Sequence, residues 1–343
     1  MTGVDGMSSA KSKTDTEFEA DSFYSKNGLL KLGYQINEKV SVETFLNFDA
    51  FEYDFDGGAF SDSEVNTGNQ EQLRVGVKPS YTYTKGQLYL LAAVNSVKRG
   101  LNQFNSFSNT LDNYQFEGNS LFLDLVNKYE FSNQFQLIAG VNYQEHSNQS
   151  ENPFGTIDKE VANFNTLDPY ASLVYISKYG LSANVGGRLN MHNVYGNQFV
   201  YDGNLAYSVV KDDNATVKLL TSYSTAFIAP SLYQLYDGYS GNIDLKPETN
   251  ETFEVGVDAR YKDWLSAGVV YFNRKEVNAI IYDNTTYLYG NSSSDANGIE
   301  IQTKVVPSSF LTVNASYTYI DRDVLERTLM ITYLQTNWWP ELM

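Results

Sequence analysis

Few side chains in this sequence could carry out acid–base or metal chemistry. The 343 residues include no cysteine and two histidines, His146 and His192. Both lie near the ends of predicted strands and could share a metal ion at one rim, but no H-x-E spacing accompanies them. His192 with Asp202 or Ser182 could also supply the base and nucleophile of a hydrolase. Exposed polar residues are the simpler interpretation of both histidines, so we expect no catalytic residue, no metal ligand and no cofactor.

An acidic segment offers carboxylate oxygens, which are the ligands that calcium prefers. Asp54, Asp56 and Asp62 surround the pair Gly57-Gly58. The usual twelve-residue spacing and the terminal bidentate glutamate of a calcium loop are missing. We therefore interpret this segment as a solvated acidic loop.

Aromatic residues are abundant and could bind a ligand by stacking. The chain has 27 tyrosines and 20 phenylalanines, and its formal charge of −17 argues against a nucleic-acid partner. Aromatic rings in the predicted loops could anchor a ligand or belong to a membrane-interface girdle, and the sequence leaves both open. These rings are Phe104, Phe107, Tyr114, Phe154, Tyr233, Tyr236, Tyr239, Tyr287 and Tyr289. As candidate ligand-binding residues we single out Tyr233, Tyr236 and Tyr239.

The elements that must position these side chains are strands. In residues 252–261, apolar Phe253, Val255 and Val257 alternate with polar or small Glu254 and Gly256. The same period of two recurs along the chain, and no sustained 3.6-residue pattern competes with it. The sequence therefore predicts an all-β, antiparallel fold of about 14 strands. The predicted strands are 22–36, 38–56, 70–85, 86–100, 112–130, 133–147, 165–178, 180–193, 203–212, 214–227, 250–262, 264–282, 294–307 and 309–322.

The connections predict a membrane barrel. Tight turns alternate with long polar loops at 57–69, 101–111, 148–164, 228–249 and 283–293, which is typical of outer-membrane barrels. A soluble sandwich or propeller would explain the alternation but neither the strand length nor the one-sided loops. The mean hydropathy of −0.37 and the short apolar runs exclude spanning helices. The N-terminus lacks the features of a secretory signal, yet the strand pattern favours the outer membrane of a Gram-negative bacterium.

Three consecutive segments resemble the barrel signature of TonB-dependent outer-membrane receptors. They are Ser224 to Tyr236 (STAFIAPSLYQLY), Gly241 to Glu248 (GNIDLKPE) and Glu251 to Gly256 (ETFEVG). Ala226 stands where the pattern commonly has glycine. We interpret the signature as structural, with turn-forming Asn242 and Asp244. Its other members are Pro230, Leu245, Pro247, Glu248, Glu254 and Gly256, and Glu254 is expected to face the barrel lumen.

The resemblance implies a receptor that captures a scarce nutrient, such as a ferric siderophore or vitamin B12, and imports it with energy relayed by TonB. It also implies a monomeric, non-enzymatic protein of 22 strands surrounded by outer-membrane lipid, with a plug and TonB box that we do not find in this sequence. We expect residues 1–325 to be a partial barrel domain and residues 326–343 to be an aberrant or truncated tail, so that the chain is a fragment. A passive porin or adhesin-like barrel and a barrel hydrolase are the alternatives.

Overall fold

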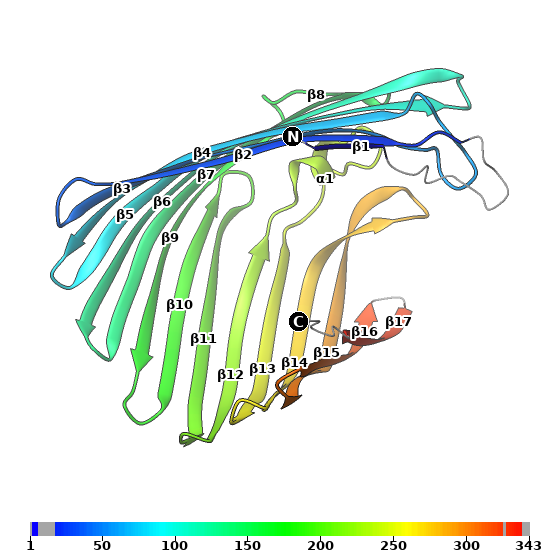
Figure 1. Ribbon diagram of the computed structural model, residues 1–343. Coiled ribbons are helices and arrows are strands. Elements are labelled where there is room, and N and C mark those ends of the chain that lie inside the picture. Colours follow the sequence, from blue (N-terminus) through cyan, green and yellow to red (C-terminus); the bar gives the residue numbers. More distant parts are fainter. Residues whose placement is uncertain (1, 6–17, 325–326, 338–343) are drawn as a thin grey trace.

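The computed structural model describes residues 2–5, 18–324 and 327–337 (Figure 1). They form a sheet of 17 strands with one short helix, α1 (Leu232–Tyr236). The strands are β1 (Thr2–Asp5), β2 (Ser22–Gln35), β3 (Val40–Asp54), β4 (Thr67–Tyr83), β5 (Gly86–Asn105), β6 (Thr110–Ser132), β7 (Phe135–Asn152), β8 (Gly155–Ile157), β9 (Asn163–Ile176), β10 (Leu181–His192), β11 (Gly196–Lys211), β12 (Ala215–Ile228), β13 (Glu248–Tyr261), β14 (Leu265–Asp283), β15 (Leu288–Ser308), β16 (Leu311–Val324) and β17 (Arg327–Asn337).

The strands pair antiparallel with their neighbours in the chain. The pairing runs from β1 through β7 to β9, and from β9 through β17, while the short β8 pairs only with the end of β7. Most registers are continuous over the full strand, as in β12 and β13, where Ala215 lies opposite Tyr261 and Ile228 opposite Glu248. Figure 1 shows that the sheet curls into an open trough, the shape of part of a barrel wall.

All fourteen predicted strands are present, and the prediction of an all-β antiparallel fold is confirmed. The structure adds β1, β8 and β17. The sheet continues past residue 325 because β17 pairs with β16 along its whole length, although the sequence there loses alternation. Backbone pairing does not need alternating side chains, so the loss of the pattern did not mark the end of the sheet. Residues 338–343 of the predicted tail lie outside the described residues.

The two ends of the sheet differ in their connections. Short turns at 36–39, 84–85, 133–134, 177–180, 212–214, 262–264 and 309–310 lie at one end, which we call the turn side. The other end, the loop side, carries the described connections 18–21, 55–66, 106–109, 153–162, 193–195, 229–247 and 284–287. The prediction of long loops at 101–111 and 283–293 is wrong. The strands continue into these segments and form hairpins whose tips are 106–109 and 284–287.

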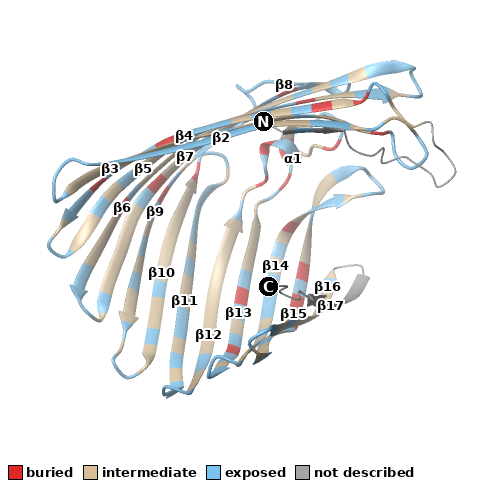
Figure 2. Cartoon of the chain, in the orientation of Figure 1, coloured by how far each residue is buried: buried red, intermediate tan, exposed pale blue. Residues whose placement is uncertain are grey.

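The strands β12, β13 and β14 show that the sheet has an apolar face and a polar face. Val255 and Val257 expose 45% and 41% of their surface on the apolar face, together with Val269 and Leu219 of the neighbouring strands. A single-layer sheet has no second layer to cover such residues, and Figure 2 shows few buried positions along the strands. Exposed aliphatic side chains in a continuous band are what a lipid-facing barrel surface requires.

Gly256 lies on the polar face, where the alternation predicts that a charged substitution costs less than at Val255 or Val257. The structure shows a separate steric cost at this position, because a Cβ at Gly256 would lie 2.8 Å from the Val269 carbonyl oxygen and 3.0 Å from the Val270 Cγ2. The glycine permits close approach of β14 to β13, so even a small side chain would force the strands to shift.

Within the described residues, no helix is long and apolar enough to cross a membrane.

Charged substitutions test the assignment of the two faces. Val257 pairs with Val269, which pairs with Ile301, so the neighbouring Gln302 lies at the same depth on the opposite face. We expect Val257→Lys to lower the free energy of unfolding in phospholipid vesicles by about 2–4 kcal/mol, because the ammonium group must enter hydrocarbon. Gln302→Lys should cost much less. Guanidinium titrations of the natural gene product that contains this chain measure both, and equal losses would contradict the assignment.

The absence of native cysteine in the chain allows its orientation to be tested by labelling. Phe107 is fully exposed at the loop-side tip between β5 and β6, and Lys85 is exposed in the turn between β4 and β5. A membrane-impermeant maleimide should label Phe107→Cys on intact cells. Lys85→Cys should react only after the outer membrane is permeabilised. The reverse pattern would invert the proposed topology.

Candidate functional site

Three loop-side connections that are distant in the sequence interlock above the sheet. They are residues 153–162 after β7, residues 229–247 between β12 and β13, and residues 284–287 between β14 and β15. The central loop, 229–247, contains α1 and most of the receptor-like signature. It contacts both of the other loops, so the rim of the sheet is bridged between β7 and β14.

The first half of the central loop docks on the connection that follows β7. Ser231 caps α1 through a reciprocal pair of hydrogen bonds with Gln234, which fixes the start of the helix. Leu232 on the helix is then buried against Ile157 and Ala162, and Tyr236 packs beside this cluster. Pro230, just before the helix, is fully buried. The helix therefore serves to join two loops.

The middle of the central loop is a tight turn built on Asp237 and Gly241. The Asp237 carboxylate accepts hydrogen bonds from the backbone N–H of Tyr239 and Ser240 and from the Ser240 hydroxyl. A Cβ at Gly241 would lie 2.4 Å from the Asp237 carbonyl oxygen, so only glycine fits this position. This turn sets the direction in which Tyr239 projects.

The second half of the central loop is fastened to the start of β15. Asn242 donates its side-chain amide to the Tyr289 carbonyl at 2.8 Å and accepts the Asp244 N–H. Asn291 donates to the Lys246 carbonyl at 2.9 Å and accepts the Lys246 N–H at 2.8 Å. Leu245, between Asn242 and Lys246 in the sequence, is buried, and the Tyr195 hydroxyl donates a hydrogen bond to its carbonyl oxygen. Asn291 was not expected from the sequence, because it lies outside the signature.

The remaining signature residues hold β13 to its neighbours. The Glu248 carboxylate accepts the N–H of Ile280, and the Glu254 carboxylate accepts the Ser222 hydroxyl at 2.7 Å. Glu254 lies on the polar face, opposite Phe253 and Val255, as the alternation predicts. Asp244 and Pro247 lie within the turn and the exit of the central loop. None of these residues needs a ligand to explain its position.

Six aromatic rings, here called the ring cluster, lie where the loops meet. Tyr239 contacts Phe154 at 4.9 Å and Tyr287 at 6.2 Å between ring centroids. Tyr289 contacts Tyr282 at 5.3 Å and Tyr233 at 6.3 Å. Most of these rings remain about half exposed. Two of the three predicted ligand-binding tyrosines, Tyr233 and Tyr239, belong to the cluster, whereas Tyr236 packs with the buried residues below.

The electrostatics of the ring cluster follow from its neighbours. Desolvation raises the pKa of Tyr233 and of Tyr282, so both remain neutral phenols that can donate a hydrogen bond. The backbone N–H of Thr285 lowers the pKa of Asp283, at the end of β14, which keeps its carboxylate charged. The cluster therefore combines apolar ring faces, hydroxyl donors and nearby negative charge.

The two histidines are not a metal pair. The Phe164 ring lies between them, with centroids 4.8 Å from His146 and 4.8 Å from His192. His192 is only 5% exposed, so its interpretation as an exposed residue was wrong. Its Nδ1 accepts the backbone N–H groups of Val194 and Tyr195, which orders the turn beneath the central loop. The signal that was missed is the aromatic Phe164 at the start of the neighbouring strand.

A hydrolytic site at His192 is not supported by the geometry. Ser182 lies ten residues away on the same strand, a distance of roughly 33 Å in an extended chain. Asp202 pairs with Gly186, six residues from His192, and accepts a hydrogen bond from Asn204 instead. The serine, the histidine and the aspartate therefore cannot act together.

Three carboxylates form an acidic group, of which the sequence predicted only Asp56 and Asp62. Oxygens of Glu19, Asp56 and Asp62 lie within 4.8 Å of one another, which brings a residue before β2 to the acidic loop after β3. A hydrogen bond with Asp62 raises the pKa of the Glu19 carboxyl. The three oxygens could contact a cation. The expected solvated loop did not include Glu19.

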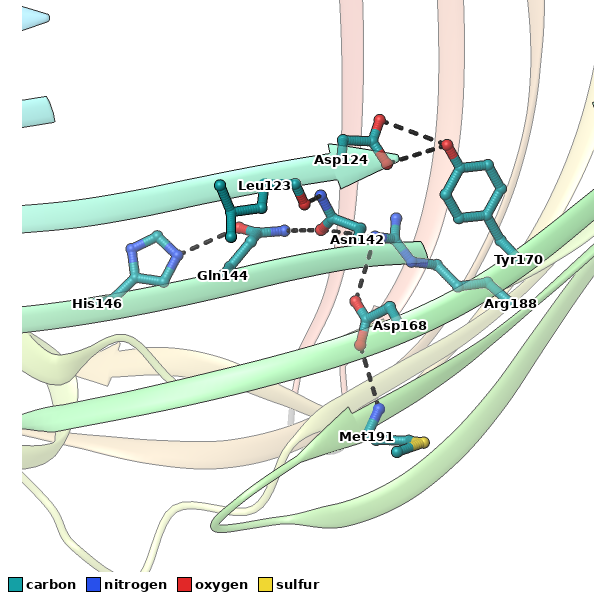
Figure 3. Close-up of polar contacts among 9 residues, drawn as sticks. All are labelled: Leu123, Asp124, Asn142, Gln144, His146, Asp168, Tyr170, Arg188 and Met191. Atoms are coloured by element: carbon teal, nitrogen blue, oxygen red, sulfur yellow. Dashed lines mark hydrogen bonds and ion pairs between the residues drawn. The ribbon is translucent and has the colours of Figure 1, made fainter. Parts of the chain in front are cut away.

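The polar face carries a hydrogen-bonded network below the loops (Figure 3). Arg188 forms an ion pair with Asp168 at 3.2 Å and donates to the Asn142 side chain at 3.0 Å. Asp168 also accepts the N–H of Met191, and the Tyr170 hydroxyl donates to Asp124. These contacts link β6, β7, β9 and β10. Alternation places the residues on one face but does not identify the partners.

Comparison with known proteins agrees with this geometry. Residues 5–337 match the family described as TonB dependent receptor-like, beta-barrel. A vitamin B12 transporter, BtuB of Vibrio cholerae, is 30% identical over 149 residues, which cover 42% of this chain and 23% of the transporter. Among solved structures, the copper transporter OprC has a TM-score of 0.72 at 14% identity, over 90% of this chain and 54% of that chain.

The siderophore receptor PirA from Acinetobacter baumannii has a TM-score of 0.70 at 14% identity, over 93% of this chain and 56% of that chain. The chain thus spans about half the length of the solved receptors, and these likenesses show the fold alone. The family match covers nearly the whole chain and carries the assignment. The chain belongs to the TonB-dependent receptor-like β-barrel family, in the outer membrane of Gram-negative bacteria.

Proposed function

We propose that this chain forms part of the wall and mouth of a receptor that takes up a scarce small-molecule nutrient. The observation that carries the proposal is the ring cluster, in which three distant loops meet at the mouth of a barrel of this family. Half-exposed tyrosine and phenylalanine rings held by a rigid support lose little entropy on binding. The hydrogen bonds between residues 240–246 and β15 supply that support.

Ferric siderophores and vitamin B12 are the cargo classes that we favour. The similar proteins include a vitamin B12 transporter, a siderophore receptor and a copper transporter. Uptake would use energy supplied through TonB, the partner that gives the family its name. Outer-membrane lipid surrounds the apolar face, and the receptor is proposed to act as a monomer.

A passive porin is the second candidate of a different class. The interlocked loops argue against it, because the central loop bridges the rim from β7 to β14 and would narrow an open channel. An enzymatic role has no support in the arrangement of His192, Ser182 and Asp202. The receptor therefore remains the better proposal.

Uptake measurements distinguish a receptor from a porin. Cells that lack the natural gene product should lose saturable uptake of labelled cyanocobalamin or of a ferric siderophore supplied at nanomolar concentration. Cells that lack TonB should show the same loss, because a receptor of this family needs an energy supply. Uptake that is unsaturable and unchanged without TonB would support the porin instead.

Substitution of the rings tests the proposed binding surface. We expect Tyr239→Ala with Tyr287→Ala to weaken binding of the cargo on the order of tenfold, because each buried ring contact contributes about 1 kcal/mol. Phe107→Ala is the matched control, since this ring is exposed at the tip of another loop-side hairpin. Binding of labelled cargo to outer membranes measures both. Equal affinities for the double variant and the control would remove the ring cluster from the binding site.

A further inference from the structure

Formal charge is distributed unequally between the two ends of the sheet. The described loop-side connections carry nine aspartates and glutamates against two lysines. The turn-side connections carry four acidic residues and four basic residues. The negative charge of the connections is therefore concentrated at the mouth, where a ligand must arrive.

The immediate surroundings of the ring cluster repeat this pattern. Asp237 lies in the turn that carries Tyr239, and Asp244 is exposed in the same loop. Asp283 adjoins Tyr282 and remains ionised, because the backbone N–H of Thr285 and the side chain of Thr286 lower the pKa of its carboxyl. Lys246 is the only basic residue of the central loop. The segments that carry the cluster therefore contain three aspartates and one lysine, a surplus of negative charge.

This charge has a physical consequence for ligand selection. At physiological ionic strength charges interact over about 8 Å, so several carboxylates act together on a ligand that enters the mouth. A surface of one sign attracts ligands of the opposite sign and repels those of its own. Aromatic ring faces add attraction for cations and for flat apolar groups, and offer little to an anion.

We propose that the ring cluster takes a neutral or cationic ligand with a flat or apolar face, and that the acidic mouth rejects polyanionic ligands. The inference rests on the proposed receptor function and narrows its cargo. Within the siderophores it favours uncharged or cationic hydroxamate-type complexes over ferric tris-catecholates, which carry a triple negative charge. Neutral corrinoids also satisfy the requirement.

Binding of three probes to outer membranes containing the natural gene product tests the inference. The probes are cyanocobalamin, a cationic ferric trihydroxamate and a trianionic ferric tris-catecholate. At least one of the first two should bind 10-fold or more tightly than the tris-catecholate. Tighter or equal binding of the tris-catecholate would overturn the inference while the receptor function stands. No specific binding of any probe would overturn the receptor proposal, and the inference with it.

Charge substitutions show whether the mouth selects ligands by their charge or by their shape. Glu160→Lys with Asp244→Lys changes two exposed loop-side residues, and should reduce the preference against the tris-catecholate about tenfold relative to the unchanged protein. Glu38→Lys with Asp213→Lys makes the same change in charge on the turn side and should alter the preference less than twofold. Equal effects of the two double variants, or none from either, would show that the mouth does not select by charge.

Discussion

Hydrogen bonding between the backbones of adjacent strands is the constraint on which the rest of this structure depends. In hydrocarbon an unpaired N–H or C=O group costs several kcal/mol, so a membrane-spanning sheet must pair nearly every one. The long, continuous registers of β5 with β6 and of β12 with β13 meet this requirement. The register shifts lie toward the ends of the strands, where water can satisfy the backbone. One, between Glu276 and Ala279, is on the loop side, and those at Glu130/Ser132, Ser208/Val210 and Val305/Ser308 are on the turn side.

Because the strands form a single layer, close packing of apolar side chains occurs in the loops and not between sheets. A single layer buries little, and the described hydrophobic core cluster, Ile157, Ala162 and Leu232, lies in the loops. In these loops, residues of the receptor-like signature form turns, a helix cap and hydrogen bonds. These contacts hold loop 229–247 between loop 153–162 and the hairpin of β14 and β15. Asn242, Gly241 and Leu245 thus have a structural role, and what they position is the ring cluster.

Ion pairs and hydrogen bonds between strands order the side chains of the polar face. Arg188 is held by Asp168 and Asn142, and Glu276 lies between Arg274 and Arg322 with the Ser294 hydroxyl donating to it. Each buried carboxylate in these groups has a basic partner, which is the condition under which burial of charge is tolerated. These networks cross several strands and stiffen the wall beneath the mouth.

The sequence by itself determined the strands, their two faces and the sidedness of the connections, because side-chain alternation and turn residues are local signals. It also identified the receptor-like signature, and the aromatic residues that it placed in loops include five of the six clustered rings, all but Tyr282. Only the tertiary structure decided which loops meet. Phe154, Tyr239 and Tyr287 come together through the docking of α1, and Tyr282 faces Tyr289 because a register shift near Asn278 realigns the hairpin. It also decided that Phe164 covers His192, that Glu19 joins Asp56 and Asp62, and that β17 extends the sheet. Most of these contacts join residues tens of positions apart, and no local pattern encodes which of many polar or aromatic side chains will become neighbours.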